Sequence, residues 1–237
     1  MKGLIFCAGL GTRFKPWTDH HPKALAVVNG KSLLQRNVEY LQQYEIRDLI
    51  VNVHHFADQI EEEIRRNDGW GSSIRISDER NEVLETGGGL LKAAPMLHGE
   101  RFVALNVDIL TDLDLEAMIS FHKKQKNLAT LAVSRRETSR YFLFDETGQM
   151  CGWRNVKTGD EKISRKHSPL LQKAFSGVHI IENNLLSLIK QTGKFSIVDV
   201  YLDLSVSNKI GGFDHTGSKL IDVGKPDSVQ VAESMFP

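Results

Sequence analysis

Residues 2–13 read KGLIFCAGLGTR, in which the apolar run Leu4–Cys7 leads directly into the turn Gly9–Gly11 and then into Arg13. A short apolar run that ends in a turn is typical of a strand buried in a parallel sheet. In open α/β sheets, ligands bind just beyond the carboxyl ends of the strands, which is where this turn lies. Glycine lets the backbone turn sharply and point successive amides inward, so the stretch indicates either an ordinary turn or a loop that holds phosphate oxygens.

Two well-known phosphate loops do not fit the sequence. A dinucleotide-binding GxGxxG loop that starts at Gly9 needs glycine at position 14, which is Phe14. The triplet Gly30-Lys31-Ser32 ends like a Walker loop, but that loop needs glycine at position 25, which is Leu25. We therefore interpret the triplet as a turn followed by Ser32 as the N-cap of a helix.

Two cations follow the first turn, one two residues after a glycine and the other directly after a proline. Arg13 offers a planar fork of donors to a triphosphate, and Lys23, directly after Pro22, offers a mobile point charge. Each could be a solvated surface cation when considered alone. Together with the glycine turn, they favour a ligand that carries several phosphates.

Strand-like and helix-like segments alternate along the first half of the chain. The patterns predict strands over 2–7, 48–53, 74–77, 101–107 and 129–134, and helices over 32–44, 56–67, 88–94 and 115–125. Later segments predict a hairpin of 141–144 with 150–156, strands over 175–181 and 219–223, and helices near 184–191, 199–205 and 227–234. This order predicts an α/β fold, a Rossmann-like three-layer α/β/α sandwich with a mostly parallel mixed sheet. We expect one domain, 1–237, in which the halves 1–135 and 136–237 complete one sheet.

Composition excludes several classes of function. The 237 residues include 30 Lys and Arg against 30 Asp and Glu, so the formal net charge is zero, and we expect no nucleic-acid partner. No stretch approaches the roughly 20 apolar residues of a membrane-spanning helix, and the first residues lack the pattern of a secretory signal. Cys7 and Cys151 are too few for a disulfide framework. We expect a cytoplasmic protein with no membrane partner, and we leave open whether it forms a homo-oligomer.

The extended motif Gly9-x-Gly11-Thr12-Arg13-x-x-Pro16-x-Thr18-x-x-x-Pro22-Lys23-x-Leu25 resembles the signature of the sugar-1-phosphate nucleotidyltransferases. The resemblance implies a GT-A-like nucleotidyltransferase fold in which residues 1–135 bind the nucleotide and residues 136–237 bind the sugar phosphate. It also implies that the first loop wraps a nucleoside triphosphate, that Arg13 contacts the phosphates, and that Lys23 helps to bind and activate them. The loop residues concerned are Ala8, Gly9, Gly11 and Thr12.

Later stretches extend the resemblance over most of the chain. Residues 84–89, LETGGG, resemble the family's second loop, which approaches the nucleobase. Residues 175–179 and 195–199 resemble the segments that lie under and beside the sugar. The residues that the resemblance assigns to the nucleotide and to the sugar phosphate are Glu85, Thr86, Gly87, Gly177 and Asp199.

Two aspartates, Asp108 and Asp222, each follow an apolar strand-like run. An aspartate in this position often caps a turn. The carboxyl ends of parallel strands share one edge of a sheet, however, and Mg²⁺ typically takes one or two carboxylates together with substrate phosphates. The resemblance assigns both residues as metal ligands, with Asp108 also catalytic, and implies Mg²⁺ as the cofactor. The expected reaction needs positioning and charge neutralisation rather than a covalent nucleophile: a phosphate oxygen attacks the α-phosphorus, and pyrophosphate leaves.

The sequence departs from the family where many relatives carry a Glu-Lys-Pro segment that binds the sugar phosphate. The corresponding strand reads GWRNVK over 152–157, and Glu161-Lys162-Ile163 lacks the proline. The candidates for this contact are Asn155, Lys157, Arg154 and Lys162.

The departure leaves the substrates open. The short chain and the LETGGG run most resemble the N-acetylmuramate-1-phosphate uridylyltransferases of cell-wall recycling, which implies UTP and N-acetylmuramate 1-phosphate as substrates. Mannose- or heptose-1-phosphate guanylyl transfer and phosphocholine cytidylyl transfer are the alternatives. A third is a non-catalytic module that binds sugar nucleotides. A glycosyltransferase would also carry an Asp-x-Asp, and Asp112-Leu113-Asp114 matches that string, but such an enzyme would not be expected to carry the first loop.

Overall fold

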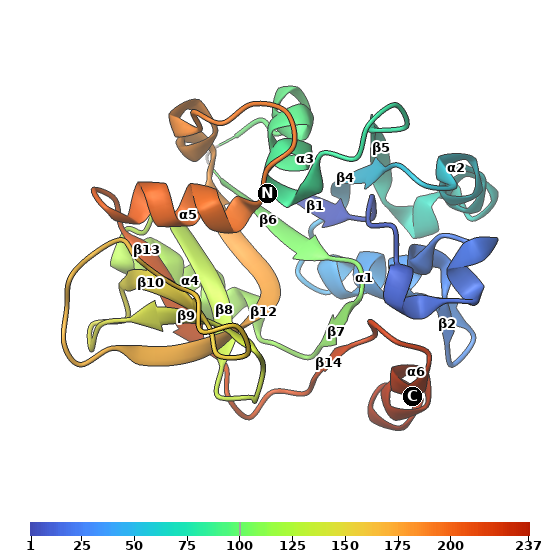
Figure 1. The fold of residues 1–237 in the computed structure, drawn as a ribbon. Helices are drawn as coiled ribbons and strands as arrows, with labels where there is room; N and C mark the ends of the chain where they lie inside the picture. Colours follow the sequence, from blue (N-terminus) through green and yellow to red (C-terminus); the bar gives the residue numbers. More distant parts are fainter. Residues whose placement is uncertain (100) are drawn as a thin grey trace.

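A ten-stranded mixed sheet runs through the computed structural model, which describes residues 1–99 and 101–237 (Figure 1). Its main path follows the order β11-β10-β9-β12-β6-β1-β4-β5. Off this path, β8 pairs with β12, and β13 pairs with β8. The strands are β1 (Lys2–Phe6), β4 (Asp48–Val53), β5 (Ser73–Asp78), β6 (Arg101–Asn106), β8 (Ala129–Ser134), β9 (Arg140–Phe144), β10 (Met150–Asn155), β11 (Glu161–Ile163), β12 (Leu171–Glu182) and β13 (Ile210–Asp214). Two short ribbons pair β2 (Val27–Val28) with β3 (Lys31–Ser32), and β7 (Ile109–Thr111) with β14 (Leu220–Asp222).

Six α-helices lie among the described residues, together with short 3₁₀ helices at Thr12–Phe14, Trp17–Asp19 and Lys23–Leu25. The α-helices are α1 (Leu33–Gln42), α2 (Ala57–Arg66), α3 (Glu85–Ala93), α4 (Leu115–Gln125), α5 (Ile197–Ser205) and α6 (Asp227–Met235). The predicted N-cap is confirmed, because the Ser32 hydroxyl accepts a hydrogen bond from the Gln35 amide at the start of α1. No helix in the described part of the chain is both long and apolar enough to cross a membrane.

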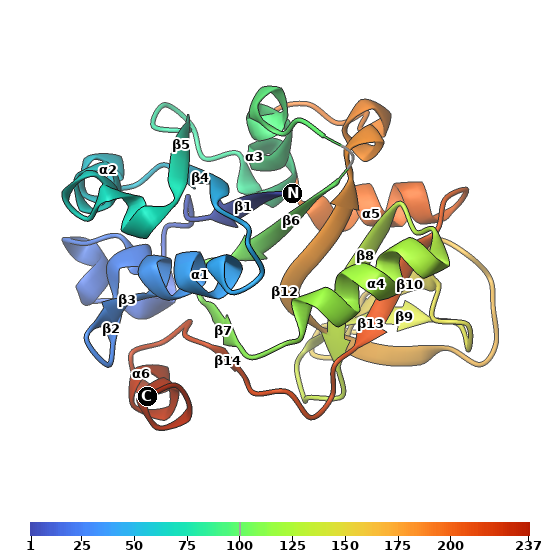
Figure 2. The ribbon, with the colours of Figure 1, turned by 180° about the vertical axis from the view of Figure 1, so that it is seen from behind.

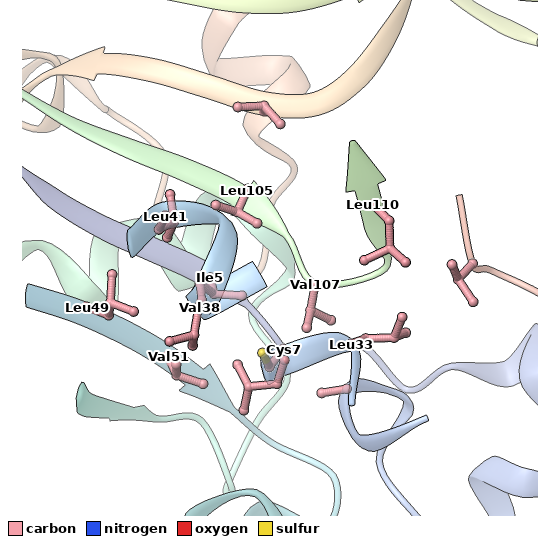
Figure 3. Packing of buried hydrophobic residues seen from close by; sticks show 14 of the residues in the cluster. Ile5, Cys7, Leu33, Val38, Leu41, Leu49, Val51, Leu105, Val107 and Leu110 are labelled. Atoms are coloured by element: carbon pink, nitrogen blue, oxygen red, sulfur yellow. The ribbon is translucent and has the colours of Figure 1, made fainter. Parts of the chain in front are cut away.

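The sheet separates two layers of helices, as its alternating side chains require. Ile5 of β1 belongs to one buried cluster, whereas its neighbours Leu4 and Phe6 belong to another on the opposite face. Helices α3 and α5 cover one face, seen in Figure 1, and α1 and α4 cover the other, seen in Figure 2. Figure 3 shows how α1 packs on the sheet: its side chains Leu33, Val38 and Leu41 lie against β1 and its neighbours. The predicted fold class is therefore confirmed.

Parallel pairing brings several strand ends to one edge of the sheet. β1 lies between β4 and β6, parallel to both, so Phe6 pairs with Asn52 on one side and with Asn106 on the other. β8 runs in the same direction, because both β6 and β8 pair antiparallel with β12. The residues that follow β1, β4, β6 and β8 therefore emerge at the same edge.

The second half of the chain is built differently. The predicted hairpin is confirmed as antiparallel β9 and β10, in which Trp153 pairs with Phe142. The helix expected near 184–191 is instead a 3₁₀ helix over Asn183–Leu188, and α3 begins at Glu85 rather than at residue 88. Five strands were not expected: β2, β3, β7 and β11, which are short, and β13, whose Gly211 and Gly212 resemble a turn in sequence.

Candidate active site

The loop after β1 is shaped by Gly11. This residue has a φ of 61°, and its carbonyl accepts a hydrogen bond from the Thr18 hydroxyl at 2.9 Å. A Cβ at Gly11 would lie 2.8 Å from Thr18 Cγ2 and 3.2 Å from Lys23 Cβ, so glycine is what lets Lys23 approach the loop. Gly9 has open space around it, and both Thr12 and Arg13 are exposed. The tip of the loop is therefore accessible to a ligand.

The base of the loop is directed at the protein instead. The amides of Cys7 and Ala8 both donate to Oδ1 of Asn52, at 2.6 and 3.3 Å. The Cys7 and Ala8 amides thus have a partner within the protein, and the contact of Ala8 with the nucleotide stays a prediction. The exposed stretch from Gly9 to Arg13 remains for phosphate binding.

The two predicted metal ligands lie side by side, although they are far apart in sequence. In the β7–β14 ribbon Asp222 pairs with Ile109, and the Val223 amide donates to the Asp108 carbonyl at 2.8 Å. Burial and the neighbouring Asp108 carboxylate raise the pKa of Asp222. The ribbon therefore concentrates negative charge at the end of β6, beside the loop after β1.

Two cations lie against these carboxylates. The Lys23 ammonium forms an ion pair with Asp108, with both side chains largely buried. Arg13 lies beside Gly224: a Cβ there would be 2.6 Å from Asp222 Oδ1 and 2.9 Å from Arg13 Nη2. The structure therefore brings together the four charged residues that the sequence predicts for the reaction.

The pair of carboxylates is a donor set suited to Mg²⁺, which takes its other ligands from phosphates and water. Within residues 1–99 and 101–237, no three His, Cys, Asp or Glu side chains are grouped as a metal site. His54 and His55 have other neighbours: His54 Nδ1 bonds to the Glu79 carbonyl at 2.7 Å, and His55 packs on Phe56.

The second loop packs tightly on the segment before α5. The Gly87 amide donates to the Phe195 carbonyl at 3.0 Å, and a Cβ at Gly87 would lie 2.4 Å from the Phe195 ring. The Thr86 hydroxyl accepts from the Ile197 amide at 3.2 Å. Of the three predicted base-binding residues, Gly87 and Thr86 thus contact the chain itself. Glu85 is exposed at the start of α3, with its carboxylate 3.9 Å from the Lys194 ammonium.

On the sugar side, Gly177 lies next to the residues that flank Asp108, a predicted metal ligand. Its φ is 74°, and a Cβ there would lie 2.6 Å from Ile109 and 3.3 Å from Asn106 Nδ2, the residues on either side of the 107–108 turn. Asp199, in the first turn of α5, accepts from the Lys162 ammonium at 2.9 Å. This contact joins two of the predicted sugar-side residues.

Asn155 is the last residue of β10, and Lys157 lies in the turn that leads to β11. Asn155 is buried, and its Oδ1 accepts from the Lys157 amide at 3.0 Å, while its own amide donates to the Asp160 carbonyl. The Asn155 side chain therefore shapes this turn. Arg154 pairs with Glu161 across the same hairpin at 2.5 Å.

Arg136 is a candidate site residue that the sequence did not reveal. It follows β8 at the same edge as Asp108, and its guanidinium donates to the Phe175 carbonyl at 2.7 Å, two residues before Gly177. Arg136, Arg13 and Lys23 all counteract the raised pKa of Asp222. The one sequence signal for Arg136 is its position two residues after an apolar strand. The sequence does not distinguish it further, because the run Arg135-Arg136-Glu137 resembles an ordinary charged loop.

The chain matches the nucleotidyl transferase family over residues 2–233. It is 29% identical to the N-acetylmuramate alpha-1-phosphate uridylyltransferase of Caulobacter vibrioides, an alignment that covers 98% of this chain and 95% of that protein. It is 34% identical to the mannose-1-phosphate guanyltransferase beta-A of Xenopus laevis, over 100% of this chain and 64% of that protein. The crystal structure of HddC from Yersinia pseudotuberculosis has the same fold, with a TM-score of 0.79, 23% identity, and coverage of 100% of this chain and 99% of that one.

Proposed function

The chain belongs to the nucleotidyl transferase family, and from that premise we propose that it transfers a nucleoside monophosphate from a triphosphate to a sugar 1-phosphate. One observation carries the proposal. Arg13, Lys23, Asp108 and Asp222 come from three distant parts of the chain and meet beside an exposed glycine loop. In the proposed reaction, an oxygen of the sugar phosphate forms a bond to the α-phosphorus. The bond from that phosphorus to pyrophosphate breaks.

Two cations of the first loop would serve the triphosphate. Arg13, exposed beside Gly224, has a fork of donors suited to the phosphates of the departing pyrophosphate. Lys23 is held at Asp108 and can exchange this carboxylate for a phosphate oxygen without leaving the site. Fixed charges at these positions stabilise the charge that develops during transfer, and this effect is usually the largest in such reactions.

Asp108 and Asp222 are the residues that would hold Mg²⁺. The raised pKa of Asp222 reflects a buried carboxylate beside a second one, an arrangement that a divalent cation would relieve. When bound, Mg²⁺ would neutralise the charge of the phosphates that the two substrates bring together.

The acceptor phosphate would be bound from the second half of the chain. Arg136 uses one nitrogen for the Phe175 carbonyl, and no carboxylate pairs with it among the residues that the structure describes. Its remaining donors are therefore available for an anion. Lys162, held by Asp199, is a second candidate, since it lies opposite Trp153 of the 152–157 segment that corresponds to the relatives' Glu-Lys-Pro. This division supports one domain, 1–237, with a nucleotide-binding half and a sugar-phosphate-binding half.

UTP and N-acetylmuramate 1-phosphate are the substrates that we favour, because the Caulobacter relative matches this chain over nearly the full length of both proteins. The enzyme would then act in the cytoplasm on a sugar of the cell wall. Guanylyl transfer to mannose 1-phosphate is the second candidate, supported by the higher identity to the Xenopus relative. The exposed carboxylate of Glu85 can accept from the single N–H of uracil or from two donors of guanine.

Pyrophosphate release tests the proposal. UTP, GTP, CTP, dTTP and ATP would each be combined with Mg²⁺ and with N-acetylmuramate, N-acetylglucosamine, glucose, mannose and heptose 1-phosphates, and with phosphocholine. We expect the highest kcat/KM for UTP with N-acetylmuramate 1-phosphate. A preference for GTP with mannose or heptose 1-phosphate would replace these substrates and leave the reaction class intact. If no pair released pyrophosphate, the proposed reaction would be refuted.

A further inference from the structure

A buried amide and a buried carboxylate lie behind the two loops that face the proposed nucleotide site. Asn52 is the fifth residue of β4 and Glu79 follows β5, and their side chains are 1% and 0% exposed. Asn52 Nδ2 donates to Glu79 Oε1 at 2.7 Å, while Asn52 Oδ1 accepts the amides of Cys7 and Ala8. The other oxygen of Glu79 accepts from the Leu84 amide at 3.2 Å. One chain of hydrogen bonds thus joins the loop after β1 to the loop before α3.

The direction of every bond in this chain is fixed by Glu79. A carboxylate only accepts, so it orients the NH₂ group of Asn52 toward itself and the carbonyl oxygen of Asn52 toward the first loop. Burial raises the pKa of Glu79, whereas the bonds from Asn52 and from the Leu84 amide favour its ionised form. The donor and the acceptor of each hydrogen bond follow from the positions of these atoms and do not depend on the pKa.

Gly89 provides the room for this arrangement. A Cβ at Gly89 would lie 2.7 Å from Glu79 Oε1 and 2.9 Å from Asn52 Nδ2. The third glycine of the LETGGG run thus lets α3 approach the buried pair closely. The structure thus explains this glycine by the close packing of α3, with no need for a contact to a ligand.

We propose that Asn52 and Glu79 are positioning residues that fix the two nucleotide-facing loops relative to each other and thereby set the affinity for the nucleoside triphosphate. The proposal rests on the proposed function, in which the first loop holds the phosphates and the second holds the base. Neither side chain reaches the surface, so both act through the backbone of Cys7, Ala8 and Leu84.

Two isosteric substitutions each break this chain. In Glu79→Gln, the new NH₂ group must face either Asn52 Nδ2 or the Leu84 amide, and both are donors. In Asn52→Asp, a carboxylate oxygen faces Glu79 Oε1, so two buried acceptors and two negative charges meet. The double variant N52D/E79Q restores every pair, with donor and acceptor exchanged only between residues 52 and 79. Its aspartate accepts from Cys7, Ala8 and the new glutamine, and the carbonyl of that glutamine accepts from Leu84.

The experiment measures the Kd of UTP and GTP by calorimetry, and then kcat, the KM of the triphosphate and the KM of the acceptor. We expect each single variant to weaken triphosphate binding about tenfold or more, as the loss of a buried hydrogen bond does, with the acceptor KM changed much less. The double variant should recover to within about threefold of the wild type. Asp78→Asn is the matched control. The exposed side chain of Asp78, next to Glu79, accepts a hydrogen bond only from the Arg80 amide and forms an ion pair only with the Arg80 guanidinium among the described residues.

Amide hydrogen exchange separates this proposal from the reaction itself, since it needs no substrate. Glu79→Gln should increase exchange at both Ala8 and Leu84, and the double variant should reverse both increases. The proposal is overturned if Ala8 is unaffected, if folded single variants bind the triphosphate like the wild type, or if a folded double variant stays weak. Should the single variants not fold, Gly89→Ala provides a milder displacement of the pair, and an unchanged triphosphate Kd in that variant also overturns the proposal. A wild type that binds UTP or GTP but releases no pyrophosphate refutes the proposed reaction alone.

Discussion

The two halves of the site are supported in different ways. Behind the first loop, Asn52 and Glu79 are fully buried, and glycines at 11, 87 and 89 bring neighbouring segments into close contact. In the second half, the pair of Lys162 and Asp199 is 60% and 46% exposed in its side chains. A buried network holds one geometry, because any change leaves a polar group unsatisfied, whereas an exposed ion pair contributes little to stability. The rigid first half is therefore suited to binding the nucleotide in one fixed geometry. The more exposed second half is suited to the choice of acceptor.

The largest expected effect tests whether the centre of the reaction lies between the two halves. Asp108→Asn removes a charge from the proposed Mg²⁺ site, and we expect kcat to fall by about a hundredfold to a thousandfold. The fold should persist, because the β7–β14 ribbon is held by backbone bonds. Pyrophosphate release and thermal unfolding measure the two outcomes. Asp112→Asn is the control, since its Oδ1 accepts only from the Lys219 amide among the described residues and an asparagine can do the same. Near-normal turnover of Asp108→Asn with Mg²⁺ would contradict the metal assignment.

Arg13→Ala tests the first half alone. Loss of this exposed guanidinium removes a donor from the pyrophosphate side, so we expect kcat to fall by about a hundredfold with the acceptor KM little changed. Lys15→Ala is the control, because that lysine pairs on the surface with Asp19. An effect confined to the acceptor KM would place Arg13 in the other half of the site and break the comparison.

Arg136→Ala tests the second half in the same way. We expect the acceptor KM to rise about tenfold, the usual scale for a lost hydrogen bond to a charged group, with the triphosphate KM unchanged. Arg135→Ala is a close control, because the side chain of this neighbour is 76% exposed and its Nε lies 4.0 Å from Asp214 Oδ2. Equal effects of the two alanine variants would remove Arg136 from the site.

Local sequence predicted the regular elements well, since these depend on spacing within one segment. The strand over 48–53, the helix over 115–125 and the strand over 129–134 have the predicted bounds. β7 and β13 were missed because each is defined by its partner: β7 pairs with β14, more than a hundred residues later, and β13 pairs with β8, in parallel. A three-residue run and a strand containing two glycines give no periodic signal by themselves.

The site residues also divide into those that local sequence predicts and those that depend on distant partners. The charged residues of the motifs could be predicted, because the reaction requires their chemistry. Asn52 and Glu79 could not, because an asparagine inside a strand and an acid within the charged run 77–82 resemble surface residues. Their burial becomes favourable only when two loops supply donors and acceptors, and this depends on the tertiary fold.

The smallest expected effect is on stability. It concerns the buried core of the second half and the way its free energy of unfolding depends on pH. His179 lies in β12, in the core of the second half, where its Nδ1 bonds to the Tyr201 hydroxyl at 2.7 Å. Burial lowers the pKa of His179 from 6.5 to about 3. Below pH 6.5 the unfolded chain therefore binds a proton that the folded chain does not bind, so the free energy of unfolding falls as the pH is lowered.

Between pH 7 and pH 6 this one group should lower the free energy of unfolding by somewhat less than about 1 kcal/mol, and the loss should approach about 1.4 kcal/mol per unit at lower pH. His179→Gln keeps a partner for the Tyr201 hydroxyl but does not titrate. Urea unfolding at several pH values should therefore give a shallower dependence for this variant than for the wild type. Identical slopes would mean that residue 179 binds its proton over the same pH range in the folded and unfolded chains, and the lowered pKa of His179 would be refuted.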